Sequence, residues 1–89
     1  MTPDLVLPRD FSDYAWEVEA KGWFAGALLS FAGDLREVTF YDPVRLAQDV
    51  EADMMHDGQT TLVRVIVIEK VTAQNMRRAA SHITSEFFS

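Results

Sequence analysis

The chain of 89 residues contains no cysteine, only four glycines and only three prolines. Without cysteine it can form neither disulfides nor thiolate metal sites, and it has no cysteine nucleophile. Secreted domains of this size usually depend on disulfides, so their absence favours the reducing cytoplasm. The apolar runs fall far short of the roughly 20 residues that a membrane-spanning helix needs. We therefore expect a cytoplasmic protein that does not bind a membrane.

Basic residues are scarce, with eight Lys and Arg against fourteen Asp and Glu and a net charge of −6. Residues 1–58 hold twelve acidic and four basic residues, whereas residues 59–89 hold two acidic and four basic ones. An acidic body repels phosphate backbones, which argues against nucleic acid as a partner. The charge suits a basic protein partner, because complementary fields favour encounter. The net negative charge would equally well serve only to keep the protein soluble.

The short motifs of common enzyme classes are also missing. There is no G-x-S-x-G nucleophile elbow, no G-x-G-x-x-G phosphate loop, no H-E-x-x-H zinc helix and no acidic calcium loop. We therefore name no catalytic residue, no metal ligand and no cofactor.

The hydrophobic pattern predicts one α+β domain over residues 13–89, preceded by a proline-punctuated extended arm over residues 1–12. Residues 14–20 alternate between aromatic or apolar and polar side chains, which is typical of a half-buried strand. Residues 23–31 are apolar on both faces and predict a second strand, and residues 36–41 predict a third.

The clearest prediction is an amphipathic helix from Asp42 to Gly58. Asp42 is a good N-cap, and Pro43 suits the first helical position because its missing N–H has no partner there. Gly58 supplies a left-handed stop. Apolar side chains gather on one half of the helical wheel, which we expect to cover the sheet.

Residues 61–69 are rich in β-branched side chains and predict a central strand, buried on both faces. Thr72 then caps a predicted second helix over residues 73–87. The expected order is β-β-β-α-β-α, a four-stranded mixed sheet with a parallel crossover and two helices packed on one face.

This arrangement leaves a second sheet face with more aromatic surface than a monomer usually exposes, which indicates an interface. The aromatic candidates are Tyr14, Trp16, Trp23, Phe24 and Phe31. The leading hypothesis is a non-catalytic protein that acts through protein–protein contacts, either as a homodimer through this face or by binding a basic protein. A small-molecule sensor, with a pocket between the aromatic sheet and a helix, is a further alternative.

A polar row on the predicted helix gives the second set of interface candidates: Arg45, Asp49, Asp53 and His56. Their spacings of three and four residues allow weak ion pairs on a solvated face. The acidic residues of the row could also bind a basic protein partner.

Asp13 followed by Glu19-Ala20-Lys21 resembles the signature of metal-dependent nucleases, in which two carboxylates hold magnesium and a lysine assists. A metal-dependent hydrolase is therefore the enzymatic alternative. Lys21 falls in a predicted turn, outside the strand on which that signature places it.

Overall fold

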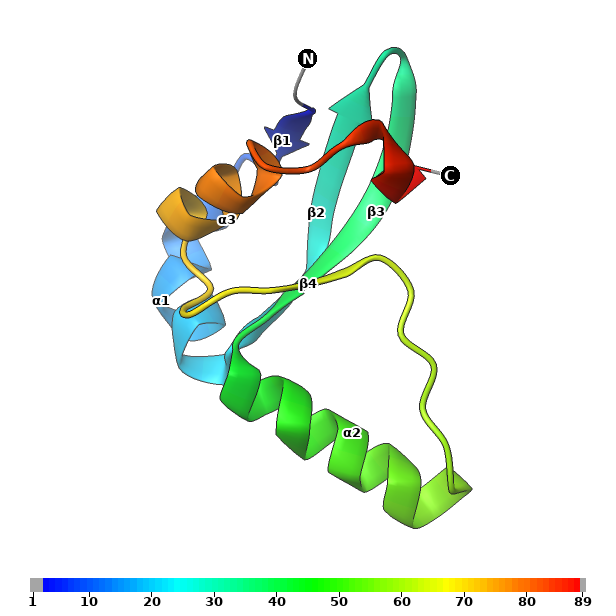
Figure 1. Cartoon of the computed structure of the whole chain (residues 1–89). Helices are drawn as coiled ribbons and strands as arrows, with labels where there is room; N and C mark the ends of the chain where they lie inside the picture. Colours follow the sequence, from blue (N-terminus) through cyan, green and yellow to red (C-terminus); the bar gives the residue numbers. More distant parts are fainter. Residues whose placement is uncertain (1–2, 89) are drawn as a thin grey trace.

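The computed structural model describes residues 3–88, apart from the side chains of Ser85 and Phe88. Its elements are β1 (Asp4–Val6), α1 (Phe11–Lys21), β2 (Trp23–Phe31), β3 (Asp34–Tyr41), α2 (Pro43–Asp57), β4 (Val65–Val67), α3 (Ala73–Ala80) and the 3-10 helix η1 (Ser85–Phe88). The strands form one sheet in the order β1-β2-β3-β4 (Figure 1). β3 and β4 are parallel, and the other neighbouring strands are antiparallel. The α+β class, the four-stranded mixed sheet and the parallel crossover are confirmed.

The strand predicted over residues 14–20 is wrong, because this segment lies in the helix α1. The alternation hid a second pattern, in which Phe11, Tyr14 and Val18 recur at helical spacing. Phe11 and Val18 are buried, whereas Trp16 is 69% exposed. The helix ends at Gly22, whose N–H donates to the Val18 carbonyl over 2.9 Å.

The fourth strand comes from the segment that we expected to be an extended arm. β1 pairs with β2, where Leu5 lies opposite Leu29. Leu5 and Leu7 pack against the chain's own core. The N-terminal segment thus completes the sheet.

The core lies on one face of the sheet, which α1 and α3 cover (Figure 1). Its largest fully buried side chains come from β2, β3, α3 and the loop before α3: Phe40, Leu29, Met76, Val38 and Val71. Two helices therefore pack on one face as predicted, but the first of them is α1 and not α2.

The C-terminal part is more broken than the sequence predicts. The strand expected over residues 61–69 shrinks to β4, which stands at the edge of the sheet and not at its centre. The helix expected over residues 73–87 ends at Ala80, and η1 follows after a turn. Its start is as predicted, since the Thr72 side chain accepts a hydrogen bond from the Asn75 N–H over 3.2 Å.

One contact joins the end of α1 to the start of α2. The Asp42 N–H donates to the Gly22 carbonyl over 2.8 Å. The Asp42 carboxylate accepts from the Arg45 N–H over 2.7 Å and so caps α2. Gly22 has a φ of 79°, and a Cβ added there would collide with that carboxylate. Gly22 therefore serves both the left-handed turn and the close approach of Asp42.

Replacement of this glycine should show how much the contact matters. Gly22→Ala should lower the free energy of unfolding by more than the roughly 1–2 kcal/mol of left-handed strain, because Asp42 must also move. Gly58→Ala is the matched control, since Gly58 has a φ of 70° but open space around its Cβ position. Urea unfolding of both variants gives the comparison. Equal losses would mean that the contact with Asp42 contributes nothing.

Candidate protein-binding surface

The helix α2 has the ends that the sequence predicts. It begins after the cap Asp42 with Pro43 in the first turn, and the N–H of Gly58 donates to the Met54 carbonyl over 3.0 Å. The helix leads away from the sheet, and residues 58–64 run back from its far end to β4 (Figure 1).

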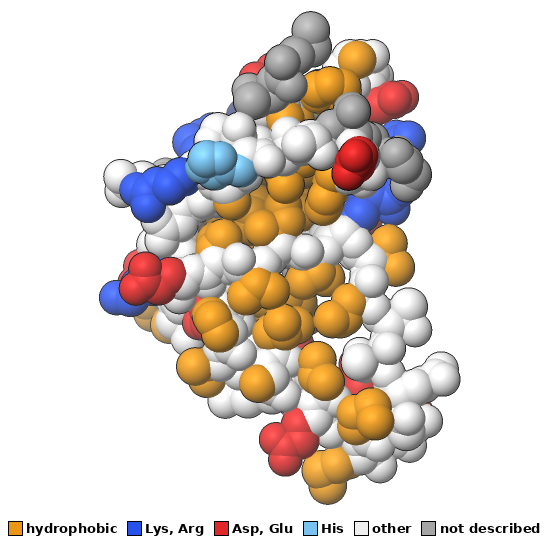
Figure 2. Space-filling view, viewed as in Figure 1, with side chains coloured by type: hydrophobic (Ala, Val, Ile, Leu, Met, Phe, Trp, Pro, Cys, Tyr) orange, Lys and Arg blue, Asp and Glu red, His pale blue; other side chains and the backbone are white. Residues whose placement is uncertain are grey.

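The apolar side of α2 does not cover the sheet, contrary to the prediction. None of the fifteen residues of the helix is buried. Met55 is 80% exposed, and Val44 and Met54 are each exposed by more than half. Hydrophobic side chains gather at the middle of this face of the molecule and continue along α2 to its end (Figure 2). An apolar helix surface without cover is the most conspicuous feature of the chain.

In the first half of α2, the polar side chains Arg45 and Asp49 face the fold instead. The Tyr41 hydroxyl donates to one carboxylate oxygen of Asp49 over 2.8 Å, and Arg45 Nε donates to the other over 2.9 Å. The Arg45 guanidinium also lies 5.5 Å from the centre of the Trp23 ring, within range of a cation–π interaction. A second nitrogen of Arg45 donates to the Lys21 carbonyl. These contacts attach the first half of α2 to the end of the β2–β3 hairpin.

The predicted row of Arg45, Asp49, Asp53 and His56 is therefore divided. Arg45 and Asp49 serve the chain's own structure. Asp53, further along α2, accepts a hydrogen bond from the Thr60 hydroxyl over 2.8 Å, and His56 is exposed.

The same contacts shift the pKa values of Asp49 and Tyr41. Burial alone would raise the pKa of Asp49, but the hydrogen bonds from Tyr41 and Arg45 and the charge of Arg45 outweigh it, so the pKa lies below its ordinary value. Burial, the hydrogen bond with Asp49 and the negative charge of Asp49 raise the pKa of Tyr41.

A groove lies beside residues 58–64, which we call the return segment, between the start of α2 and β4. Its volume is about 520 Å³. The lining comes from α2, the return segment, β4 and η1: Leu46, Leu62, Val63, Arg64, Val65, Val67 and Phe87. Val63 is 63% exposed, and Leu62 and Val67 are each close to half exposed. The sequence prediction missed this groove because it placed these residues in a buried central strand.

Arg64 is the one charged residue in the groove lining. Its φ of 51° is unusual for a residue with a side chain. Its carbonyl accepts a hydrogen bond from the Thr39 N–H over 3.1 Å, which accounts for the backbone position. Its Nε atom is buried and has no hydrogen-bond partner in the described part of the chain. Such a group is costly, because it has lost water without gaining an acceptor.

The five aromatic candidates do not form one face. Tyr14 and Phe24 pack edge-on with Phe11, at ring-centre distances of 5.6 and 5.1 Å. Trp23 lies under Arg45, Phe31 is half-buried, and Trp16 is exposed on α1. A hollow of about 290 Å³ lies between α1 and β2, at the lower limit of ordinary ligand pockets.

The nuclease-like pattern loses its structural basis. Asp13, Glu19 and Lys21 all lie on α1 and not on a strand. Glu19 and Lys21 are two positions apart, so a helix directs them to different sides. Within residues 3–88, no group of three acidic or histidine side chains is placed to hold a metal ion.

Comparisons with protein-family models, with curated proteins and with solved structures found no match. No helix in the described residues has both the length and the apolar character to cross a membrane. The surface chemistry of the chain is therefore the basis for its proposed function.

Removal of the Asp49 charge should change how stability depends on pH. The Arg45 and Asp49 side chains are 32% and 35% exposed, so Asp49→Asn should cost no more than about 1 kcal/mol at neutral pH. A lowered native pKa stabilises the fold above the unfolded pKa, near 3.8, and this contribution disappears as the pH falls through the native pKa. Denaturant unfolding at neutral pH and at about pH 3 should show that the difference in free energy of unfolding between the two proteins is smaller at the lower pH.

The exposed carboxylate of Asp34 provides a control, because Asp34→Asn removes the same charge without these two hydrogen bonds. A difference between wild type and Asp49→Asn that persists unchanged at low pH would contradict the assignment.

Proposed function

We propose that this chain is a non-catalytic protein that acts through protein–protein contacts made by the apolar side of α2 and the adjoining groove. The main observation in favour of this proposal is that none of the fifteen residues of α2 is buried. Isolated helices of this length are marginal in water. Most helices in proteins owe their stability to the burial of an apolar face, and residues 3–88 of this chain do not supply that cover.

The amount of exposed surface supports the proposal. A compact monomer of 10.1 kDa is expected to expose about 5,300 Å², whereas this chain exposes 5997 Å². Its radius of gyration is 13.5 Å, against about 12 Å for a compact domain of this length. The excess fits a chain whose projecting part is buried in an assembly.

We propose a location for the interface that differs from the one expected from the sequence. We expected self-association through an aromatic sheet face, but of the five aromatic candidates only Trp16 is exposed by more than a third. The largely exposed apolar side chains instead concentrate on α2 and on the return segment behind it: Val44, Met54, Met55, Leu62 and Val63. We therefore assign the interface to these two segments.

The charges near α2 bear on the kind of partner. Glu51, Asp53 and Asp57 accompany the apolar side chains in the second half of the helix. They disfavour nucleic acid and anionic lipid surfaces as partners, because both carry phosphate. They are compatible with a basic protein or with a second copy that presents a cation. The absence of cysteine supports a role in the cytoplasm.

A photo-crosslinking residue at position 55 should test the proposed surface. In the cell that makes the protein, we expect position 55 to form abundant crosslinks to protein, because Met55 would lie in the interface. Position 35 is the matched control, since Leu35 is also apolar and 57% exposed but lies on β3. Crosslinked mass and identity are read by gel and mass spectrometry. Equal crosslinking from both positions would contradict the proposal.

A further inference from the structure

We infer that two copies of this chain exchange their α2 helices, so that the distal half of each α2 (residues 50–57) lies in the groove of the other copy. This inference rests on the proposed function, because it names the partner for the same surface. It also states which residues meet across the interface.

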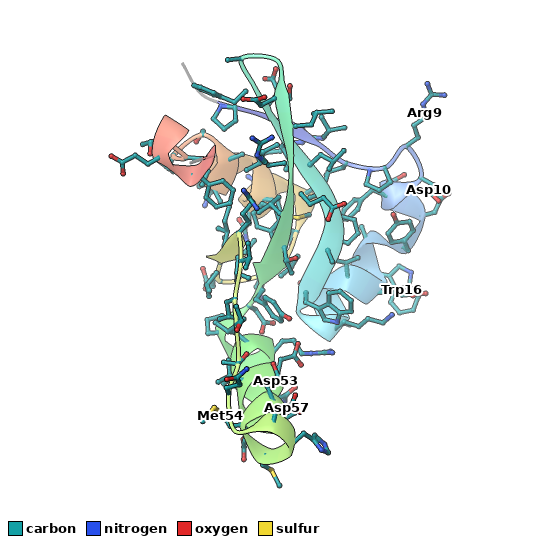
Figure 3. All side chains as sticks on the ribbon, turned by 90° about the vertical axis from the view of Figure 1, so that its right-hand side faces the viewer. Arg9, Asp10, Trp16, Asp53, Met54 and Asp57 are labelled. Atoms are coloured by element: carbon teal, nitrogen blue, oxygen red, sulfur yellow. The ribbon has the colours of Figure 1, made fainter. Side chains whose placement is uncertain are left out.

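The helix and the groove are made of different residues. Leu46 is the one α2 residue among those that line the groove, and it lies in the first turn. Met54, Met55 and Asp57 stand at the other end of the helix, and the side view shows Met54 and Asp57 at the far end of the molecule from Arg9 and Asp10 (Figure 3). One chain can therefore offer its distal α2 and accept another at the same time. Two such contacts related by a twofold axis close into a dimer.

The surface excess agrees with this arrangement. The chain exposes roughly 700 Å² more than a compact monomer of its mass. A standard protein interface buries about 800 Å² on each partner. Burial of distal α2 and of the groove would thus restore an ordinary surface to each chain.

The positive charge of Arg64 favours an acidic segment over a basic one as the occupant of the groove. Arg64 lines the groove, and its side chain forms no ion pair within the described residues. A basic partner would bring a second cation to this point, and like charges that face each other across an interface weaken association. The distal half of α2 is instead an apolar and acidic segment, with Met54 and Met55 beside Glu51, Asp53 and Asp57. This segment would bring apolar side chains to cover the apolar lining of the groove, and acidic side chains to face Arg64.

Asp57 is the residue we assign to Arg64 of the second copy. Asp57 is the last residue of α2, where the helix dipole is negative and disfavours a carboxylate. It is exposed and makes no hydrogen bond or ion pair within the part of the chain that is described. The Arg64 charge of the second copy would offset the dipole, and the Asp57 carboxylate would in turn pair with that charge.

Charge reversal tests the reciprocal pair. Wild type should be a dimer by sedimentation equilibrium. Asp57→Arg and Arg64→Asp should each weaken association by on the order of tenfold or more, because each sets like charges against each other at both contacts. An equimolar mixture should regain the dimer, because in the mixed pair both contacts again join Asp to Arg. The matched controls Glu19→Arg and Arg9→Asp reverse exposed charges on or next to α1 and should leave the dimer unchanged.

Two results of the sedimentation experiments would overturn the inference. The first is a wild type that stays monomeric at high concentration. If position 55 still crosslinks to a different protein in cells, the proposed function stands and only the second copy is excluded as partner. The second is a dimer whose single variants, once mixed, fail to reassociate.

Engineered cysteines give a readout that does not depend on the charged residues, and the chain has no cysteine of its own to interfere. Met54→Cys and Val63→Cys are prepared separately, mixed and oxidised. A disulfide that joins the two variants supports distal α2 in the groove. Disulfides that form instead within Met54→Cys alone would show that two α2 helices pack on each other, and they would overturn the exchange.

Discussion

The contact between Gly22 and Asp42 decides where the second half of this small chain goes. The backbone of Gly22 holds Asp42 at the end of the β2–β3 hairpin, and the Asp42 carboxylate then starts α2. Because α1 ends and α2 begins at this one point, the two helices diverge from it. α1 turns back over the sheet and covers the core, whereas α2 leaves the sheet behind. A side chain at position 22 would occupy the place of the cap.

The rotation of α2 about its own axis follows from weaker forces that act together. Arg45 and Asp49 engage Tyr41, Trp23 and each other, so the polar side of the first half of the helix is held against the fold. Such partly exposed pairs contribute about 1 kcal/mol or less each. A buried Val, Leu or Met side chain is worth about 1.5–3 kcal/mol. The polar contacts thus orient the helix, while the larger free energy is left for whatever covers its apolar side.

The sequence allowed the locally determined features to be predicted. The ends of α2 depend on Asp42, Pro43 and Gly58, whose effects act within a few residues, and they were placed correctly. α1 was missed because Tyr14, Trp16 and Val18 satisfy the strand period as well as part of the helical one. The decision lay in the packing of Phe11 and Val18 on the core, which is not a local property. The side of α2 that faces the fold was also misjudged, since apolar residues were assumed to be covered by their own chain.

The return segment is a second place where the local sequence pattern predicted the wrong structure. A run such as Leu62-Val63-Arg64-Val65 reads as a buried strand, because β-branched residues usually lie in the middle of sheets. Here only Val65–Val67 joins the sheet, at its edge, and the residues before it line an open groove. The discordant feature was Arg64, since a charged side chain inside a run assigned to a buried strand needs a partner. Its buried Nε has none among residues 3–88, whereas Asp57 at the end of α2 has a charge without a counterpart. The positive charge of Arg64 at the groove and the negative charge of Asp57 at the end of α2 complement each other, and the proposed helix exchange would bring them together.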